Sequence, residues 1–226
     1  MSLFLLLETS GKNCSVALAN EKNIIDTRSA SAEHFIHAEE LHGLIYKLLY
    51  ANEYSFQLLT AIAVSKGPGS YTGLRIGVSA AKGLCFALNI PLIAIDTTEI
   101  LAHHASTVYP DATLICPAID ARRMEAYCAL FDEKYHRLTP DTAMIIDAQT
   151  FATYHTQSLV IVGDGAEKCR EFVDENVRIL NILPDASMMY NPTLKAWADS
   201  RFEDVAYFEP FYLKEYVPGT AKKNIL

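Results

Sequence analysis

The sequence carries one glycine-rich segment whose residue types could do chemistry, Gly67-Pro68-Gly69-Ser70-Tyr71-Thr72-Gly73-Leu74-Arg75-Ile76-Gly77. It joins an apolar run to a helical pattern, so its glycines and main-chain amides could approach a phosphate closely. Its spacing matches neither the P-loop nor the dinucleotide fingerprint. Alternatively, Ser70 caps the helix, and Gly73, Gly77 and Ala81 form a small-residue face against which another helix packs. Spacing alone leaves both interpretations open.

Two acids, Glu8 and Asp120, each end an apolar run, where a carboxylate could hold a metal ion or orient a water molecule. Acids at strand ends are also common turn formers. His34 and His37 lie three residues apart among glutamates, which superficially resembles a metal site. A polar cluster at a helix start, however, complements the helix dipole without any metal. The residues by themselves therefore assign no catalytic residue and no metal ligand.

The composition describes an ordinary globular protein of 226 residues, half of them hydrophobic, with 19 basic and 27 acidic side chains and a net charge of −8. This acidic balance argues against a protein that holds nucleic acid by itself, because neutralised phosphates supply most of that affinity. The five cysteines form no C-x-x-C pair, so we expect reduced, buried thiols. The apolar run Leu3–Leu7 is too short for a signal peptide, and no run approaches the roughly 20 residues that span a bilayer. We therefore expect a cytoplasmic protein without a membrane partner.

Apolar runs and helical spacing predict an order of elements that starts twice along the chain. The first copy has strands at 3–8, 14–18 and 24–27, a helix at 38–50, a strand at 58–64, a helix at 74–88, a strand at 92–95 and a helix at 97–104. The second copy begins with strands at 113–120 and 125–131. Its strand at 159–162 ends in Gly163-Asp164-Gly165, as the earlier strand ends in Gly67-Pro68-Gly69. We infer an α/β protein with a tandem duplication, mixed sheets flanked by helices, and domains at 1–108 and 109–226.

Three motifs together resemble the bacterial TsaB (YeaZ) family: Glu8-Thr9-Ser10, His37-Ala38-Glu39-Glu40-Leu41 and the glycine-rich segment. The stretch Pro117–Arg123 and the terminal Pro210-Phe211-Tyr212-Leu213 extend the match over the whole chain. The resemblance implies a duplicated ribonuclease-H-like fold of the actin-like ATPase superfamily, in agreement with the internal repeat.

The same resemblance implies a role in forming N6-threonylcarbamoyladenosine in tRNAs that read codons starting with adenine. In this family's pathway TsaD transfers the threonylcarbamoyl group, assisted by TsaB and the ATPase TsaE. TsaB is the non-catalytic partner, which forms a heterodimer with TsaD, joins TsaE in a ternary complex and meets tRNA through that complex. Alone, the chain could form a homodimer. The resemblance implies no tightly bound cofactor, with ATP or ADP only at the level of the complex.

The resemblance also assigns residues. TsaB pairs with TsaD through two helices, here about 38–50 and 72–88, whose partner-binding side chains would be Leu41, Leu44, Ile45, Leu48, Gly73, Leu74, Gly77 and Ala81. On this basis, Gly77→Leu is expected to abolish pairing without unfolding the chain. The alternative is that these stripes pack on the protein's own sheet.

A second hypothesis is a nucleotide-dependent, ATPase-like enzyme. Its phosphate or nucleotide loop would use Glu8, Thr9, Ser10, Gly67, Gly69, Ser70, Thr72, Gly73, Arg75 and Asp120. TsaD has a metal-binding His-x-Glu-Gly-His pattern where this chain reads Thr97-Thr98-Glu99-Ile100-Leu101. Neither threonine nor leucine can replace imidazole as a metal ligand. The resemblance therefore implies no metal site, and it speaks against the older label of M22 glycoprotease, whose chemistry would need that metal.

Overall fold

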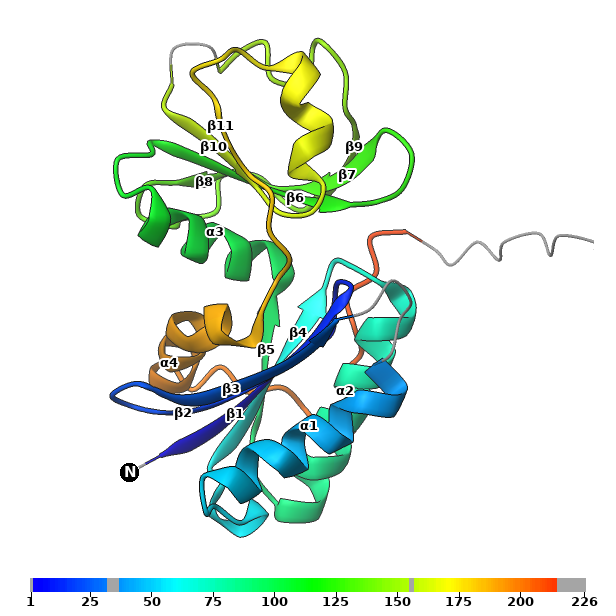
Figure 1. The fold of residues 1–226 in the computed structure, drawn as a ribbon, viewed down its shortest axis with the longest axis vertical. Helices are drawn as coiled ribbons and strands as arrows, with labels where there is room; N and C mark the ends of the chain where they lie inside the picture. The colour runs from blue at the N-terminus through cyan, green and yellow to red at the C-terminus, as the bar shows by residue number, and fades with distance from the viewer. Residues whose placement is uncertain (1, 32–36, 155–156, 215–226) are drawn as a thin grey trace, which may run out of the picture.

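The computed structural model describes residues 2–31, 37–154 and 157–214 (Figure 1). A first, five-stranded sheet has the order β3-β2-β1-β4-β5. Strand β1 is antiparallel to β2 and parallel to β4, and β4 is parallel to β5. The bounds are β1 Leu3–Glu8, β2 Asn13–Asn20, β3 Ile24–Ser31, α1 His37–Ala51, β4 Ala61–Gly67, α2 Tyr71–Leu88, β5 Leu92–Asp96 and α3 Thr97–Val108, with a 3-10 turn η1 at Phe56–Leu58. The predicted order of the first copy is confirmed.

The second sheet repeats this arrangement, with the path β11-β10-β6-β7-β9. Strand β6 is antiparallel to β7 and parallel to β10, as β1 is to β2 and β4. The bounds are β6 Leu114–Asp120, β7 Glu125–Cys128, β8 Phe131–Asp132, β9 Thr142–Ile145, β10 Leu159–Val162, η2 Ala166–Phe172, β11 Arg178–Leu180, η3 Ala186–Met189 and α4 Tyr190–Ala198. The matching strand orders confirm the duplicated architecture.

The single strand predicted at 125–131 is wrong, because the structure divides it into β7 and β8. Ala118 pairs with Cys128 and Ile115 with Phe131, so the same register places Pro117 opposite Ala129. Proline has no N–H to donate to the ladder, which explains why the pairing is interrupted at this point.

Strand β1 forms the centre of the first core, and all six of its residues are buried. Leu5 and Leu7 point to the face that α1 and α2 cover, whereas Phe4 and Leu6 point to the opposite face, covered by η3 and α4. This alternation is the period of two expected of a strand buried on both faces.

Helix α3 lies between the two sheets, as Figure 1 shows. Its Ile100 packs into the core of the first sheet, while Leu101 and Ala105 pack against the second. A helix with apolar side chains on two faces joins the halves into one packed unit.

The last part of the chain returns to the first sheet. Helix α4 packs against β5, and the rings of Trp197 and Phe4 lie 5.4 Å apart. Beyond α4, Glu203 pairs with Leu92 at the edge of the sheet. All five cysteines are free and buried, as predicted. Among the described residues, no helix is both long and apolar enough to cross a membrane.

Candidate functional site

The glycine-rich segment forms the turn between β4 and α2, at the end of the first sheet. Ser70 caps α2, because its Oγ accepts a hydrogen bond from the Gly73 amide at 3.2 Å. The Ser70 amide donates to the Ser10 carbonyl oxygen at 2.7 Å, and the Leu74 amide donates to the Ser70 carbonyl oxygen at 2.9 Å. Several main-chain amides that a phosphate would use are therefore engaged within the chain.

The glycines of this segment face the turn between β1 and β2. A Cβ atom on Gly69 would lie 2.5 Å from the Ser10 carbonyl oxygen. On Gly73 it would overlap the Thr9 carbonyl oxygen, and on Gly77 it would overlap Thr9 Oγ1. The missing side chains thus let α2 lie directly on the Thr9–Ser10 backbone, which accounts for the glycines by packing.

Glu8 lies beneath this turn and is fully buried. Its Oε1 accepts hydrogen bonds from the Ser10 amide at 2.5 Å and from Ser65 Oγ at 3.0 Å. Burial raises the pKa of Glu8 to about 7, since desolvation disfavours the charged form. Glu8 Oε2, Thr9 Oγ1 and Ser10 Oγ are buried without a hydrogen-bond partner in the structure. Thr9 lies directly against Gly73 and Gly77 of α2, so the helix covers this part of the turn.

Asp120 occupies in the second sheet the position that Glu8 occupies in the first, yet its surroundings differ. Its side chain is partly exposed and accepts a hydrogen bond from Lys168 Nζ at 2.6 Å. It also accepts from the Arg122 amide, while the Asp120 amide donates to Asp164. Asp120 is therefore held in an ion pair at the end of β6. This agrees with the alternative that an acid at a strand end stabilises the turn that follows.

Arg75 lies on the exposed surface of α2, beside Tyr71 of the glycine-rich segment. Its Nε donates to the Tyr212 hydroxyl at 3.2 Å, and its guanidinium stacks over the Tyr71 ring at 4.2 Å. Thr72 is exposed on the first turn of α2. The sequence grouped these residues with the phosphate loop, but helical geometry carries Arg75 to the outer surface of α2.

The eight residues expected to bind a partner are buried within the chain, as in the alternative that these stripes pack on the protein's own sheet. They are Leu41, Leu44, Ile45, Leu48, Gly73, Leu74, Gly77 and Ala81. The sheet needs an apolar cover, and these stripes supply it. A leucine at Gly77 would meet Thr9, so Gly77→Leu would disturb the fold itself and is unsuited to test pairing.

The outward surface of the two helices holds a groove of about 540 Å³ between α1 and α2. Its lining residues are Ala38, His42, Arg75, Ile76, Ser79, Ala80, Gly83 and Leu84. Apart from Arg75, sequence reasoning missed them, although Ile76, Ala80 and Gly83 recur at helical spacing beside the buried stripe. A partner on these helices would meet this set of residues.

Comparison with known proteins shows the family to which this chain belongs. The family described as TsaD, tRNA N6-adenosine threonylcarbamoyltransferase, matches residues 20–153. The tRNA threonylcarbamoyladenosine biosynthesis protein TsaB of Bacillus subtilis is 29% identical over 223 residues, which are 93% of each chain. The structure of YeaZ from Pseudomonas aeruginosa superimposes with a TM-score of 0.83 at 27% identity, covering 94% of this chain and 100% of that one. The chain belongs to this family and, within it, to the TsaB (YeaZ) branch.

The TsaB fold extends to more distant proteins. The activator of 2-hydroxyisocaproyl-CoA dehydratase from Clostridium difficile has a TM-score of 0.52 at 10% identity, covering 89% of this chain and 98% of that chain. At this identity the likeness concerns the fold alone, which is the duplicated ribonuclease-H-like fold of the actin-like ATPases.

In this TsaB-family chain the stretch at residues 97–101, where the sequence predicts no metal ligands, forms the start of α3. Thr97, Thr98, Ile100 and Leu101 are buried between the two sheets. Burial raises the pKa of Glu99, and nearby Asp96 raises it further. Within the described residues, no three His, Cys, Asp or Glu side chains gather to hold a metal ion. His37 is buried at the start of α1, and His34 lies outside the described residues.

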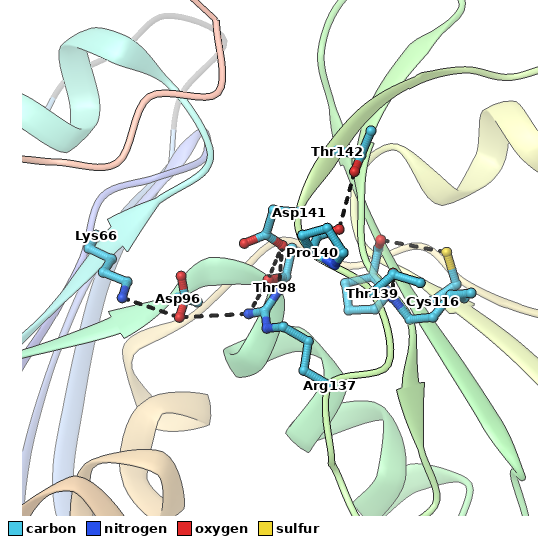
Figure 2. A network of polar contacts seen from close by, with 11 residues as sticks. Lys66, Asp96, Thr98, Cys116, Arg137, Thr139, Pro140, Asp141 and Thr142 are labelled. Carbon is cyan, nitrogen blue, oxygen red and sulfur yellow. Dashed lines mark hydrogen bonds and ion pairs between the residues drawn. The ribbon is translucent and has the colours of Figure 1, made fainter.

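A polar network lies beside the start of α3, as Figure 2 shows. Asp96 lies 3.3 Å from Lys66 Nζ and 3.6 Å from Arg137. Arg137 donates to Asp141 at 2.8 Å, and Thr98 Oγ1 donates to the same carboxylate oxygen at 2.7 Å. The network joins β4 and β5 of the first sheet to the segment between β8 and β9, and it neutralises two carboxylates with two cations.

Proposed function

We propose that this chain is a non-catalytic cytoplasmic subunit that pairs with TsaD and supports the formation of N6-threonylcarbamoyladenosine in tRNA. One observation carries the proposal. The glycines of the glycine-rich turn pack on Thr9 and Ser10 of the chain itself, whereas the groove between α1 and α2 is open. Such a chain is suited to binding a partner protein rather than to catalysing a reaction.

The glycine-rich turn supports the absence of a tightly bound nucleotide. A phosphate would have to displace the Ser10 carbonyl from the Ser70 amide and approach the buried carboxyl group of Glu8. Near the start of α3, Thr97 and Leu101 offer no metal ligand, and the ion pairs around Asp96 occupy the neighbouring space.

The charge of the chain supports an indirect contact with tRNA. A net charge of −8 opposes binding to the phosphate backbone, so the partner would hold the tRNA. The ATPase TsaE would join the pair, and nucleotide would enter at the level of that complex.

The test is to mix the chain with TsaD from the same organism and measure pairing by analytical ultracentrifugation and tRNA modification by a reconstituted assay. We expect a heterodimer, no transferase activity from the chain alone, and modification that depends on its presence. Gly83→Arg should prevent pairing, because Gly83 lines the groove and a side chain there meets open space. Ala152→Arg, on an exposed turn in the second half of the chain, is the control.

Failure of the wild-type chain to pair with TsaD, or undiminished pairing of Gly83→Arg, would contradict the proposal. The alternative of a nucleotide-dependent enzyme is tested by calorimetry of the isolated chain with ATP and magnesium. Submillimolar binding that Glu8→Ala abolishes would favour the enzyme.

A further inference from the structure

The C-terminal segment, residues 203–214, is bound along the outside of the first half of the chain, and we call it the strap. The Glu203 amide donates to the Leu92 carbonyl oxygen at 2.9 Å, at the edge of the sheet. Lys82 Nζ on α2 donates to the carbonyl oxygens of Ala206 and Phe208, at 3.3 and 2.7 Å. Figure 1 shows the strap as the orange-to-red segment that passes beside α2. Its course is therefore set by main-chain contacts with both β5 and α2.

The far part of the strap reaches the glycine-rich turn. The Phe211 amide donates to the Lys66 carbonyl oxygen at 2.7 Å, and Gly67 leaves no room for a Cβ atom beside the Phe211 carbonyl. Lys214 then contacts Glu125 of β7. The strap thus ends next to the start of α2, the helix on which the proposed partner docks.

Arg75 is clamped where the strap meets α2. Its guanidinium lies 4.2 Å from the centre of the Tyr71 ring and 6.0 Å from that of Tyr212, and the two rings are 4.7 Å apart. The hydrogen bond from Arg75 Nε to the Tyr212 hydroxyl fixes the orientation of the group. Arg75 is nevertheless exposed, so its remaining N–H groups are available to a partner.

Arg75 separates two hollows on this surface. One is the groove between α1 and α2, and the other is a hollow of about 210 Å³ between α2 and the strap. Arg75 and Ser79 line both of them. The second hollow is lined further by Val78, Lys82, Phe208, Glu209, Pro210 and Tyr212. The groove and the strap hollow therefore form one continuous surface with an arginine at its middle.

The charge of Arg75 is not neutralised by an ion pair among the described residues. Arg28, Arg137 and Arg178, in contrast, each have a carboxylate partner within 4.0 Å. Glu209 lines the strap hollow without reaching ion-pair distance of Arg75, and Lys82 is occupied by strap carbonyls. A fixed arginine stacked on tyrosines, with a mainly apolar groove on one side and a hollow of mixed polarity on the other, has the composition typical of an interface hot spot.

We propose that the strap and α2 together form the docking surface for TsaD, and that TsaD places a carboxylate on Arg75. The inference rests on the proposed function and adds to it a specific contact between Arg75 and a carboxylate of TsaD. The TsaD family matches residues 20–153, which include α1 and α2, so the partner is expected to offer a pair of helices of the same kind. Apolar side chains of those helices would fill the hollows, and a carboxylate would pair with the guanidinium fork.

The test measures the dissociation constant of the full-length chain and TsaD by calorimetry at 50 and 500 mM salt. Arg75→Ala is expected to weaken binding by about 10- to 100-fold at low salt, the usual effect of losing a charge-assisted contact at a hot spot. Tyr212→Phe keeps the ring but loses the hydroxyl that orients Arg75, and should weaken binding by roughly 2- to 5-fold. Both variants should also reduce the salt dependence of the dissociation constant, Arg75→Ala by more than Tyr212→Phe.

Arg178→Ala is the matched control, because Arg178 is also an arginine over a tyrosine ring, 4.9 Å from Tyr109, on the second sheet. It should bind TsaD as the wild type does. Thermal unfolding of each variant checks that the chain stays folded, which is expected because Arg75 is exposed.

Three outcomes would overturn the inference. If the wild-type chain pairs with TsaD and Arg75→Ala pairs equally well, the docking surface is wrong while the proposed function stands. If Arg75→Ala weakens binding without reducing its salt dependence, the carboxylate is wrong. If the wild-type chain does not bind TsaD at all, the proposed function and this inference fail together.

Discussion

The close approach of α2 to the β1–β2 turn predicts three different outcomes for three glycine substitutions in one helix. A Cβ at Gly77 would overlap the side-chain hydroxyl of Thr9, and a Cβ at Gly73 would overlap the Thr9 main-chain carbonyl. A Cβ at Gly83 would meet nothing within 4 Å. Alanine therefore probes a side-chain contact at Gly77, a main-chain contact at Gly73 and open space at Gly83.

The expected magnitudes follow from two opposing effects. Overpacking a core costs about 1–3 kcal/mol, and replacing a helical glycine by alanine contributes roughly 1 kcal/mol in the opposite direction. Gly83→Ala should stabilise the chain by about 0.5–1 kcal/mol. Gly77→Ala should destabilise it by about 1–2 kcal/mol, an overpacking cost of about 2–3 kcal/mol less the gain from alanine. Gly73→Ala should destabilise it by about 2–3 kcal/mol, because Gly73 lies in the first turn of α2, where alanine gains little, and because the carbonyl cannot rotate away as a side chain can.

A second substitution separates the two contacts. Thr9→Ala removes the hydroxyl and methyl groups that Gly77→Ala would meet but leaves the carbonyl that Gly73→Ala would meet. We therefore expect Thr9→Ala to suppress the cost of Gly77→Ala by about 1–2 kcal/mol and to leave the cost of Gly73→Ala unchanged.

The assay is equilibrium unfolding in urea, followed by fluorescence of Trp197, which is the only tryptophan and packs on Phe4 of β1. Its signal reports on the sheet that α2 covers. The reasoning is refuted if Gly77→Ala stabilises the chain as much as Gly83→Ala does, or if Thr9→Ala rescues Gly73→Ala and Gly77→Ala equally.

Two further predictions concern buried and bridging charges. Burial raises the pKa of Glu8 from 4.5 to about 7, so the stability that its neutral form contributes is complete below pH 4.5 and is lost as the pH rises to about 7. The glutamine of Glu8→Gln cannot ionise, so this variant does not lose that stability as the pH rises. Its unfolding free energy minus that of the wild type should therefore rise by about 3 kcal/mol between pH 4.5 and 8. A difference that stays constant with pH would contradict the prediction. Asp141→Ala should cost about 1–2 kcal/mol in thermal unfolding, because it removes the acceptor shared by Arg137 and Thr98. The control Arg170→Ala breaks the exposed pair with Glu167 and should leave stability unchanged, so equal effects of the two would count against the network.

Local sequence patterns were sufficient to predict the duplicated fold. The opening apolar runs and the paired glycines recur in the same order in both halves, and each is a property of neighbouring residues. Gly67 and Gly163 have positive φ angles of 115° and 126°, so the two strand-ending turns need glycine for the same reason. Ser70 and Asn89 mark the two ends of α2, as their residue types predict.

Helical periodicity indicated which positions of α1 and α2 are apolar, but it does not state what covers them. Only the tertiary structure decided that Leu41 and Gly77 face the chain's own sheet and that Ala38 and Gly83 face outward. In the same way, Glu8 and Asp120 are equivalent in the repeat, yet one is fully buried and the other lies in an exposed ion pair. Burial depends on neighbours that are distant in sequence.

The sequence by itself therefore determined the order of elements in the first half, the duplication and the family, because these depend on short-range periodicity and on motifs read along the chain. The tertiary structure decided the candidate docking surface. Arg75 and Tyr212 are 137 positions apart, and Lys82 meets a strap carbonyl 126 positions away. No local pattern encodes such contacts, since they arise only when the last segment of the chain folds back across the first sheet.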